Sequence, residues 1–225
     1  AYLLILCYKL CNTPEQRTNM ERLPFYTPEL DRAVPSPEQA AILSVIDLLR
    51  DPRLADEITA GNVTLAMIRP QVGPDANQRG VPDLEAADEI EEMIMGLGVM
   101  AKFSFTFSAH AAETFYAGGP QSSMLNEPAR NPLQYDTRWP EFVDFMSSGP
   151  TTVLLLHSPK GDAIPRWRAH LGHWNIDEVR DPATIRGRFG VNKYNNLVHG
   201  SDASEAVIRE IGIITDCLVS TVEAQ

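Results

Sequence analysis

The stretch NNLVHGSDASEAVIREIGI, residues 195–213, joins a short apolar segment to a helix-forming segment through one histidine. We predict a strand over residues 196–199 and a helix over residues 202–213, because Asp202 and Glu205 have the spacing of a capping box. His199 would then lie where the strand ends and the helix begins. A lone histidine is usually a structural residue, so its role depends on the rest of the chain.

The segments upstream of this stretch alternate between strand and helix patterns. We predict further strands over 63–69, 99–107 and 151–156, and helices over 83–98, 108–117, 141–146 and 163–172. The strands are short apolar or alternating runs, and the helix over 83–98 has one apolar and one acidic face. This order contains the split βαβ unit of a ferredoxin-like sheet. We therefore expect an α+β fold of four antiparallel strands covered by helices.

The first 60 residues have a different composition. Prolines at 14, 24, 28, 35 and 37 interrupt them, and a helix follows that starts with Ser36 as N-cap and Pro37 in its first turn. The apolar residues 1–10 are too few to span a bilayer and predict a strand or docking arm. We expect residues 1–60 to be an N-terminal extension that docks on the main domain or a partner. The main domain would cover 61–217, with a C-terminal tail over 218–225.

The charge pattern limits the classes of ligand. The formal net charge is −11, which argues against a general binder of nucleic acid or anionic membranes. The window from Lys160 to Lys193 nevertheless carries a charge of +3. It includes residues 173–195, a long segment without a clear helix or strand pattern that holds Arg180, Arg186 and Arg188. This local charge indicates either a small anionic ligand or a few surface arginines.

Cysteines and histidines give no metal-site pattern. The three cysteines, Cys7, Cys11 and Cys217, have no disulfide or zinc spacing, which favours a reducing compartment, cytoplasmic or mitochondrial. His170 and His173 lack a third ligand, and we predict no protein-held metal. We expect these two histidines, like His110 and His157, to be structural.

Three motifs together point to one family. The segments N-x-x-H-G-S-D at 196–202, T-I-R-G-x-F at 184–189 and S-G-P at 148–150, with T-L-A-M-I-R-P at 64–70, resemble the nucleoside diphosphate kinase family over roughly residues 62–214. The resemblance implies a ferredoxin-like fold and transfer of the γ-phosphate of a nucleoside triphosphate to a nucleoside diphosphate through a phosphohistidine. A neutral imidazole suits this chemistry, because it is nucleophilic at neutral pH.

The resemblance also assigns roles to other residues. It implies His199 as the nucleophile, Glu210 as the group that orients its imidazole, and Ser201 as the hydroxyl that partners Glu210. It implies a set of nucleotide-binding residues: Arg69, Tyr116, Trp139, Arg168, Arg186 and Asn196. Guanidinium groups suit phosphate oxygens. Mg²⁺ would arrive with the nucleotide. The resemblance also implies a homo-oligomer, because the family usually forms symmetric oligomers.

Several positions depart from the family pattern. Arg69 replaces a lysine, Trp174 replaces a phosphate-binding threonine, and Lys193 replaces an apolar residue near the base. The segments after Arg69 and after Tyr116 are longer than the family's. Three alternatives therefore stay open: an active kinase, a catalytically weak or inactive subunit of a large ciliary or mitochondrial assembly, and an acidic regulatory domain that keeps only the fold.

Overall fold

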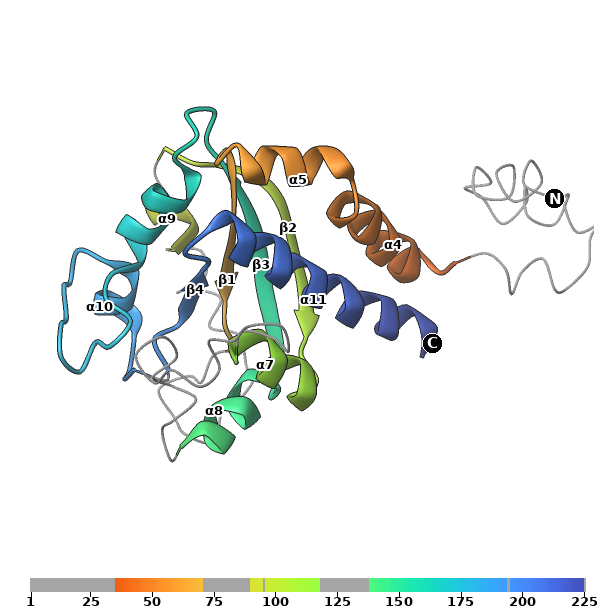
Figure 1. Cartoon of the computed structure of the whole chain (residues 1–225). Coiled ribbons are helices and arrows are strands. Elements are labelled where there is room, and N and C mark those ends of the chain that lie inside the picture. Colours follow the sequence, from red (N-terminus) through yellow and green to blue (C-terminus); the bar gives the residue numbers. More distant parts are fainter. Residues whose placement is uncertain (1–34, 71–89, 95, 118–137, 194, 225) are drawn as a thin grey trace, which may run out of the picture. The chain divides into compact units, whose positions relative to one another are not determined.

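A four-stranded antiparallel sheet forms the centre of the described part of the chain. The computed structural model describes residues 35–70, 90–94, 96–117, 138–193 and 195–224 (Figure 1). The strands are β1 (Val63–Ile68), β2 (Gly98–Thr106), β3 (Pro150–His157) and β4 (Val198–Gly200). Their order is β2-β3-β1-β4, and every neighbouring pair is antiparallel. This is the predicted ferredoxin-like arrangement, which is confirmed.

Helices cover both faces of the sheet. The strand β1 is buried along all six residues, because α9 (Ala163–Leu171) packs on one face and α11 (Ser204–Glu223) packs on the other. A core cluster on the α9 side contains Ala66, Ile68, Leu154, Leu156, Trp167, Leu171 and Val198. Since successive strand residues point to opposite faces, the neighbour of Val198 in β4, His199, lies on the α11 side, opposite Met67 in the register.

The remaining helices are α4 (Pro37–Leu49), α5 (Pro52–Thr59), α7 (Ala109–Tyr116), α8 (Trp139–Met146) and α10 (Ile185–Phe189). The predictions for α4, α7, α8 and α9 agree with these bounds within a few residues, and Ser36 accepts a hydrogen bond from the Gln39 amide as expected of an N-cap. Of the helix predicted over 83–98, residues 83–89 lie outside the described residues, and 90–93 are helical.

Two helices were missed, and one capping prediction was wrong. Both α5 and α10 form where no helix was predicted, although each has a side-chain cap, Asp51 for α5 and Thr184 for α10. The capping box of Asp202 and Glu205 does not form, because α11 begins at Ser204 with Ala203 at the N-cap and no side-chain cap. The helix α11 continues to Glu223 and so includes most of the segment expected as a C-terminal tail.

The chain divides into two compact units between Ser44 and Val45. Only residues 35–44 of the first unit are described, and the sheet with its covering helices belongs to the second. The expected docking role of residues 1–60 stays a prediction. Among the described residues, no helix is long and apolar enough to cross a membrane.

Candidate active site

A strained turn and a close packing contact fix the backbone on either side of His199. Leu197 has a φ of 75°, and the amide of Val198 donates to the carbonyl of Asn196 at 2.9 Å, which together form a γ-turn around Leu197. The indole Nε1 of Trp167 donates to the carbonyl of His199 at 3.2 Å. A Cβ at Gly200 would lie 2.5 Å from that Nε1, so only glycine fits here. The turn and the indole therefore set the position of β4.

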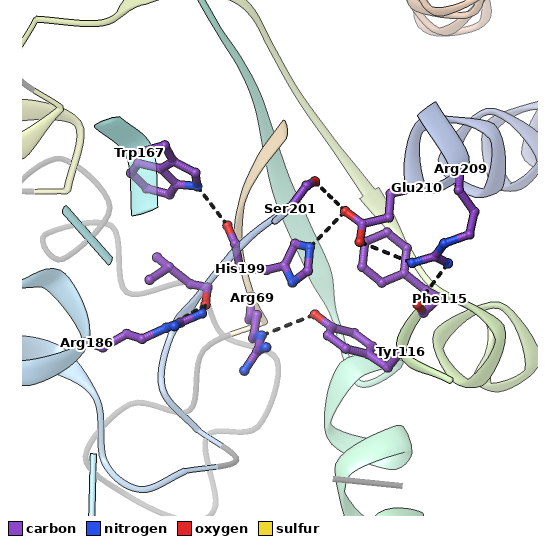
Figure 2. A network of polar contacts seen from close by, with 10 residues as sticks. Arg69, Phe115, Tyr116, Trp167, Arg186, His199, Ser201, Arg209 and Glu210 are labelled. Atoms are coloured by element: carbon purple, nitrogen blue, oxygen red, sulfur yellow. Dashed lines mark hydrogen bonds and ion pairs between the residues drawn. The ribbon is translucent and has the colours of Figure 1, made fainter. Parts of the chain in front are cut away.

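The imidazole of His199 is held by a buried carboxylate. Its Nε2 lies 2.9 Å from Oε2 of Glu210, and Ser201 Oγ donates to the same oxygen at 2.6 Å (Figure 2). The side chain of Glu210 is 5% exposed and that of His199 is 15% exposed. An ionised carboxylate only accepts hydrogen bonds, so Nε2 carries the proton, and in the neutral imidazole Nδ1 then carries the lone pair. The structure thus brings together the three residues predicted as catalytic.

Two residues around this pair were missed in the sequence. Arg209 donates from Nη2 to Oε1 of Glu210 at 3.2 Å and from Nη1 to the carbonyl of Phe115 at 3.1 Å. The Phe115 ring lies edge-on to the His199 ring, with centroids 5.1 Å apart. Arg209 directly precedes Glu210 in the sequence, but neighbouring helix positions do not face each other, so spacing gave no signal for this contact.

A second cluster lies on the side of the imidazole away from Glu210. Arg69 donates from Nε to the hydroxyl of Tyr116 at 3.2 Å and from Nη1 to Oδ1 of Asn196 at 2.7 Å. Tyr116 and His199 have ring centroids 5.7 Å apart (Figure 2). Burial raises the pKa of Tyr116, so this phenol stays neutral at ordinary pH. The cluster therefore offers one cation and one hydroxyl next to the nucleophile.

Asn196 is a structural centre of this cluster. Its amide Nδ2 donates to the carbonyls of Trp174 at 2.8 Å and Lys193 at 3.1 Å, and the side chain is buried. Both amide hydrogens are therefore used within the protein, and only Oδ1 keeps capacity to accept a further bond. Asn196 therefore joins the residues just before β4 to Trp174, between α9 and α10, and to Lys193, after α10.

Arg186 and Arg168 add positive charge beside β4. Arg186 is buried, and it donates to the carbonyl of Val198 from Nη2 at 3.0 Å and to the carbonyl of Gly172 from Nη1 at 3.1 Å. Burial, together with the charges of Arg69 and Arg168, lowers the pKa of Arg186 to about 9. Arg168 is exposed. A bound anion would relieve the repulsion among these three guanidinium groups.

The two tryptophans predicted or noted near the nucleotide lie on different segments. Trp139 begins α8 and packs on Phe142, with ring centroids 5.7 Å apart, and Phe142 in turn contacts Tyr116 at 4.8 Å. Trp174 is half-buried, and its indole lies 6.1 Å from the ring of His173.

Arg180 donates to the carbonyls of Gly187 and Gly190, so it stabilises the end of α10.

The described residues contain no group of three or more His, Cys, Asp or Glu side chains that could hold a metal ion. The functional groups near His199 are instead guanidiniums, a phenol and one carboxylate that is occupied by its own partners. This donor set is suited to anionic oxygens rather than to a divalent cation.

Comparison with known proteins gives one family. The family model described as nucleoside diphosphate kinase matches residues 62–216. A nucleoside diphosphate kinase of Rhodococcus erythropolis is 33% identical over 150 residues, which cover 67% of this chain and 91% of that protein. A nucleoside diphosphate kinase homolog 5 of Danio rerio is 31% identical over 168 residues, 73% of this chain and 63% of that protein.

A shorter curated match and a solved structure belong to the same family. A nucleoside diphosphate kinase of Desulfovibrio desulfuricans is 46% identical over 70 residues, so this chain covers about half of it, 48%. A crystal structure of the Aquifex aeolicus nucleoside diphosphate kinase matches with a TM-score of 0.49 and 29% identity, covering 68% of this chain and 94% of that one.

Proposed function

Because this chain belongs to the nucleoside diphosphate kinase family, we propose that it transfers the γ-phosphate of a nucleoside triphosphate to a nucleoside diphosphate through His199. The observation that carries the proposal is the pair formed by His199 Nε2 and Glu210 Oε2 at 2.9 Å. This pair directs the lone pair of Nδ1 away from the carboxylate, to the side where Arg69 and Tyr116 lie (Figure 2). A nucleophile oriented by a buried base partner is the arrangement that covalent catalysis requires.

The proposed reaction has two steps. In the first, the Nδ1 lone pair of His199 attacks the γ-phosphorus, the bond from that phosphorus to the β–γ bridging oxygen breaks, and the nucleoside diphosphate leaves with the electron pair. In the second, a terminal β-phosphate oxygen of the acceptor attacks the phosphorus and the N–P bond breaks. Glu210 accepts the Nε2–H bond throughout and stabilises the positive charge that develops on the ring.

The cations beside His199 would bind the phosphates. Arg186 uses three of its five N–H groups on two main-chain carbonyls and keeps two for phosphate oxygens. Arg69 and exposed Arg168 would neutralise further charge, and Trp139 would stack on the base. Mg²⁺ would enter bound to the nucleotide phosphates, where it supplies charge neutralisation, since the chain offers it no carboxylate cluster among the described residues.

Incubation with γ-labelled ATP and Mg²⁺ tests this proposal. We expect an acid-labile, alkali-stable label on the wild-type chain, its transfer to added nucleoside diphosphate, and its loss in His199→Ala. His110→Ala is the matched control, because His110 is exposed at the start of α7 and has no place in the proposed site. A wild-type chain that folds and binds ATP but takes up no label would refute the proposed transfer.

A second function, nucleotide binding without catalysis in a larger assembly, is favoured by the state of Asn196. Both of its amide hydrogens are committed to main-chain carbonyls, and Trp174 stands where the family has a hydroxyl. We propose that such a subunit would work in a reducing compartment, as a homo-oligomer or with other proteins. ATP binding without label, together with a complex recovered on mild purification, would favour this second function over the first.

A further inference from the structure

We propose that Arg209 is a positioning residue for His199 and acts through Glu210; this rests on the proposed phosphohistidine function. Arg209 does not touch the imidazole. It donates to Oε1 of Glu210 at 3.2 Å, while the other oxygen, Oε2, receives His199 Nε2 and Ser201 Oγ (Figure 2). The carboxylate is thus held from two sides, with Arg209 opposite the histidine.

The two carboxylate oxygens of Glu210 have different partners, and this difference is the basis of the proposal. Two donors share Oε2, so the orientation of the carboxylate decides whether both reach it. Without Arg209, only Ser201 and His199 would fix that orientation, and both bind the same oxygen, Oε2. The group could then rotate about its last torsion, which is a soft one. Arg209 prevents this rotation by binding the opposite oxygen with a charged donor.

The second contact of Arg209 anchors the carboxylate to another helix. Its Nη1 donates to the carbonyl of Phe115 at 3.1 Å, and its guanidinium carbon lies 5.9 Å from the centre of the Phe115 ring. That ring packs edge-on to the imidazole, and the next residue, Tyr116, does so as well. Arg209 therefore links α11, which carries the carboxylate, to the end of α7, which supplies the aromatic contacts to His199. Arg209 thus fixes Glu210, the partner of the imidazole, relative to the aromatic rings on which the imidazole packs.

The chemical consequence concerns the tautomer of His199. When Oε2 is in place, Nε2 carries the proton and Nδ1 is free to attack phosphorus. When the carboxylate turns, the tautomer with a proton on Nδ1 becomes populated, and that tautomer is not a nucleophile at Nδ1. We expect Arg209→Met to form phosphoenzyme about tenfold more slowly, the size of one charge-assisted hydrogen bond, with nucleotide affinity changed less than twofold.

The test compares Arg209→Met with Arg209→Lys and with Arg53→Met. Lysine keeps the charge but cannot reach Glu210 and Phe115 together, so it should recover part of the rate. Arg53→Met is the matched control, because Arg53 pairs with Asp51 on the exposed surface of α5. Phosphoenzyme formation and the Kd for ATP are measured separately, and circular dichroism melting checks the fold.

A spectroscopic readout separates this proposal from the kinase proposal. In protein labelled with ¹⁵N-histidine, His199 is assigned by its absence in His199→Ala, and its tautomer is read without nucleotide from long-range ¹H–¹⁵N correlations. We expect a single Nε2–H tautomer in wild type and in Arg53→Met, and a mixture in Arg209→Met. This holds even if wild type takes up no label, so the two proposals fail separately.

An unchanged His199 tautomer in a folded Arg209→Met protein would overturn the positioning role. If the methionine variant does not fold, the lysine variant decides. A mixed tautomer in Arg209→Lys with a wild-type melting temperature supports the role, and an unchanged tautomer overturns it.

Discussion

The replacement Gly200→Ala tests how tightly the backbone beside His199 is packed. An added Cβ would lie 2.5 Å from Nε1 of Trp167, 2.6 Å from its Cδ1 and 2.7 Å from Cδ1 of Leu171. Ordinary van der Waals contacts are 3.4–4 Å, so these side chains would have to move by about 1 Å. Trp167 is fully buried and Leu171 nearly so, which leaves them little space to move.

The size of the stability loss in Gly200→Ala follows from two effects. Overpacking of a well-packed core costs about 1–3 kcal/mol. Displacement of the indole also breaks the bond from Trp167 Nε1 to the His199 carbonyl, and a buried donor without a partner costs about 1–3 kcal/mol. We therefore expect the free energy of unfolding to fall by about 2–6 kcal/mol if both costs apply in full. In a domain of this size that corresponds to a Tm lower by about 4–24 °C.

Urea denaturation of wild type, Gly200→Ala and Gly212→Ala measures this effect. Gly212 lies inside α11, and a Cβ there would meet nothing within 4 Å, so alanine should stabilise the protein by about 0.5–1 kcal/mol through helix propensity. A Gly200→Ala protein as stable as wild type within about 0.5 kcal/mol would refute the packing argument.

Three further changes have specific expected results. In Ser201→Ala, the buried carboxylate of Glu210 loses one hydrogen-bond donor, so the free energy of unfolding measured in urea should fall by about 1.5–3 kcal/mol. An unchanged free energy of unfolding would mean that Glu210 does not need this hydroxyl. Arg186 is protonated below its pKa of about 9 and favours an anion only in that form, so the Kd for ATP should rise as the pH increases above about 9, and Arg186→Met should lack this dependence. Burial raises the pKa of Cys217 from 9.0 to about 11. Iodoacetamide at pH 8 should therefore alkylate this thiol about a hundredfold more slowly in the folded than in the unfolded chain. Peptide mass spectrometry follows the alkylation, and equal rates would contradict the expectation.

The sheet could be predicted because its strands are apolar runs with clear ends. The strand β1 is buried on both faces, and its unbroken run VTLAMI records that burial in the sequence. The helix α10 was missed because it has five residues, fewer than a periodic pattern needs. The capping box at Asp202 failed because α11 begins at Ser204, which places Ala203 rather than Asp202 at the N-cap.

The site could be predicted only where a motif named its residues. His199, Ser201 and Glu210 belong to one motif and do meet in space. Arg209 and Trp167 could not be found in this way, because the bond of Arg209 to Phe115 and the bond of Trp167 to His199 join segments that lie far apart in the sequence. Asn196 was expected to contact nucleotide, and the sequence could not reveal that its amide is used by the carbonyls of Trp174 and Lys193.

The γ-turn at Leu197 has a consequence for the order of folding. A non-glycine residue in this conformation costs about 1–3 kcal/mol, and the turn persists because the Leu197 side chain is buried and its carbonyl accepts from the Arg69 amide at 2.9 Å. Those compensating contacts come from the core and from Arg69, directly after β1, so the turn gains nothing until they have assembled. The nucleophile should therefore reach its working geometry late, and a partly folded chain should have no competent histidine.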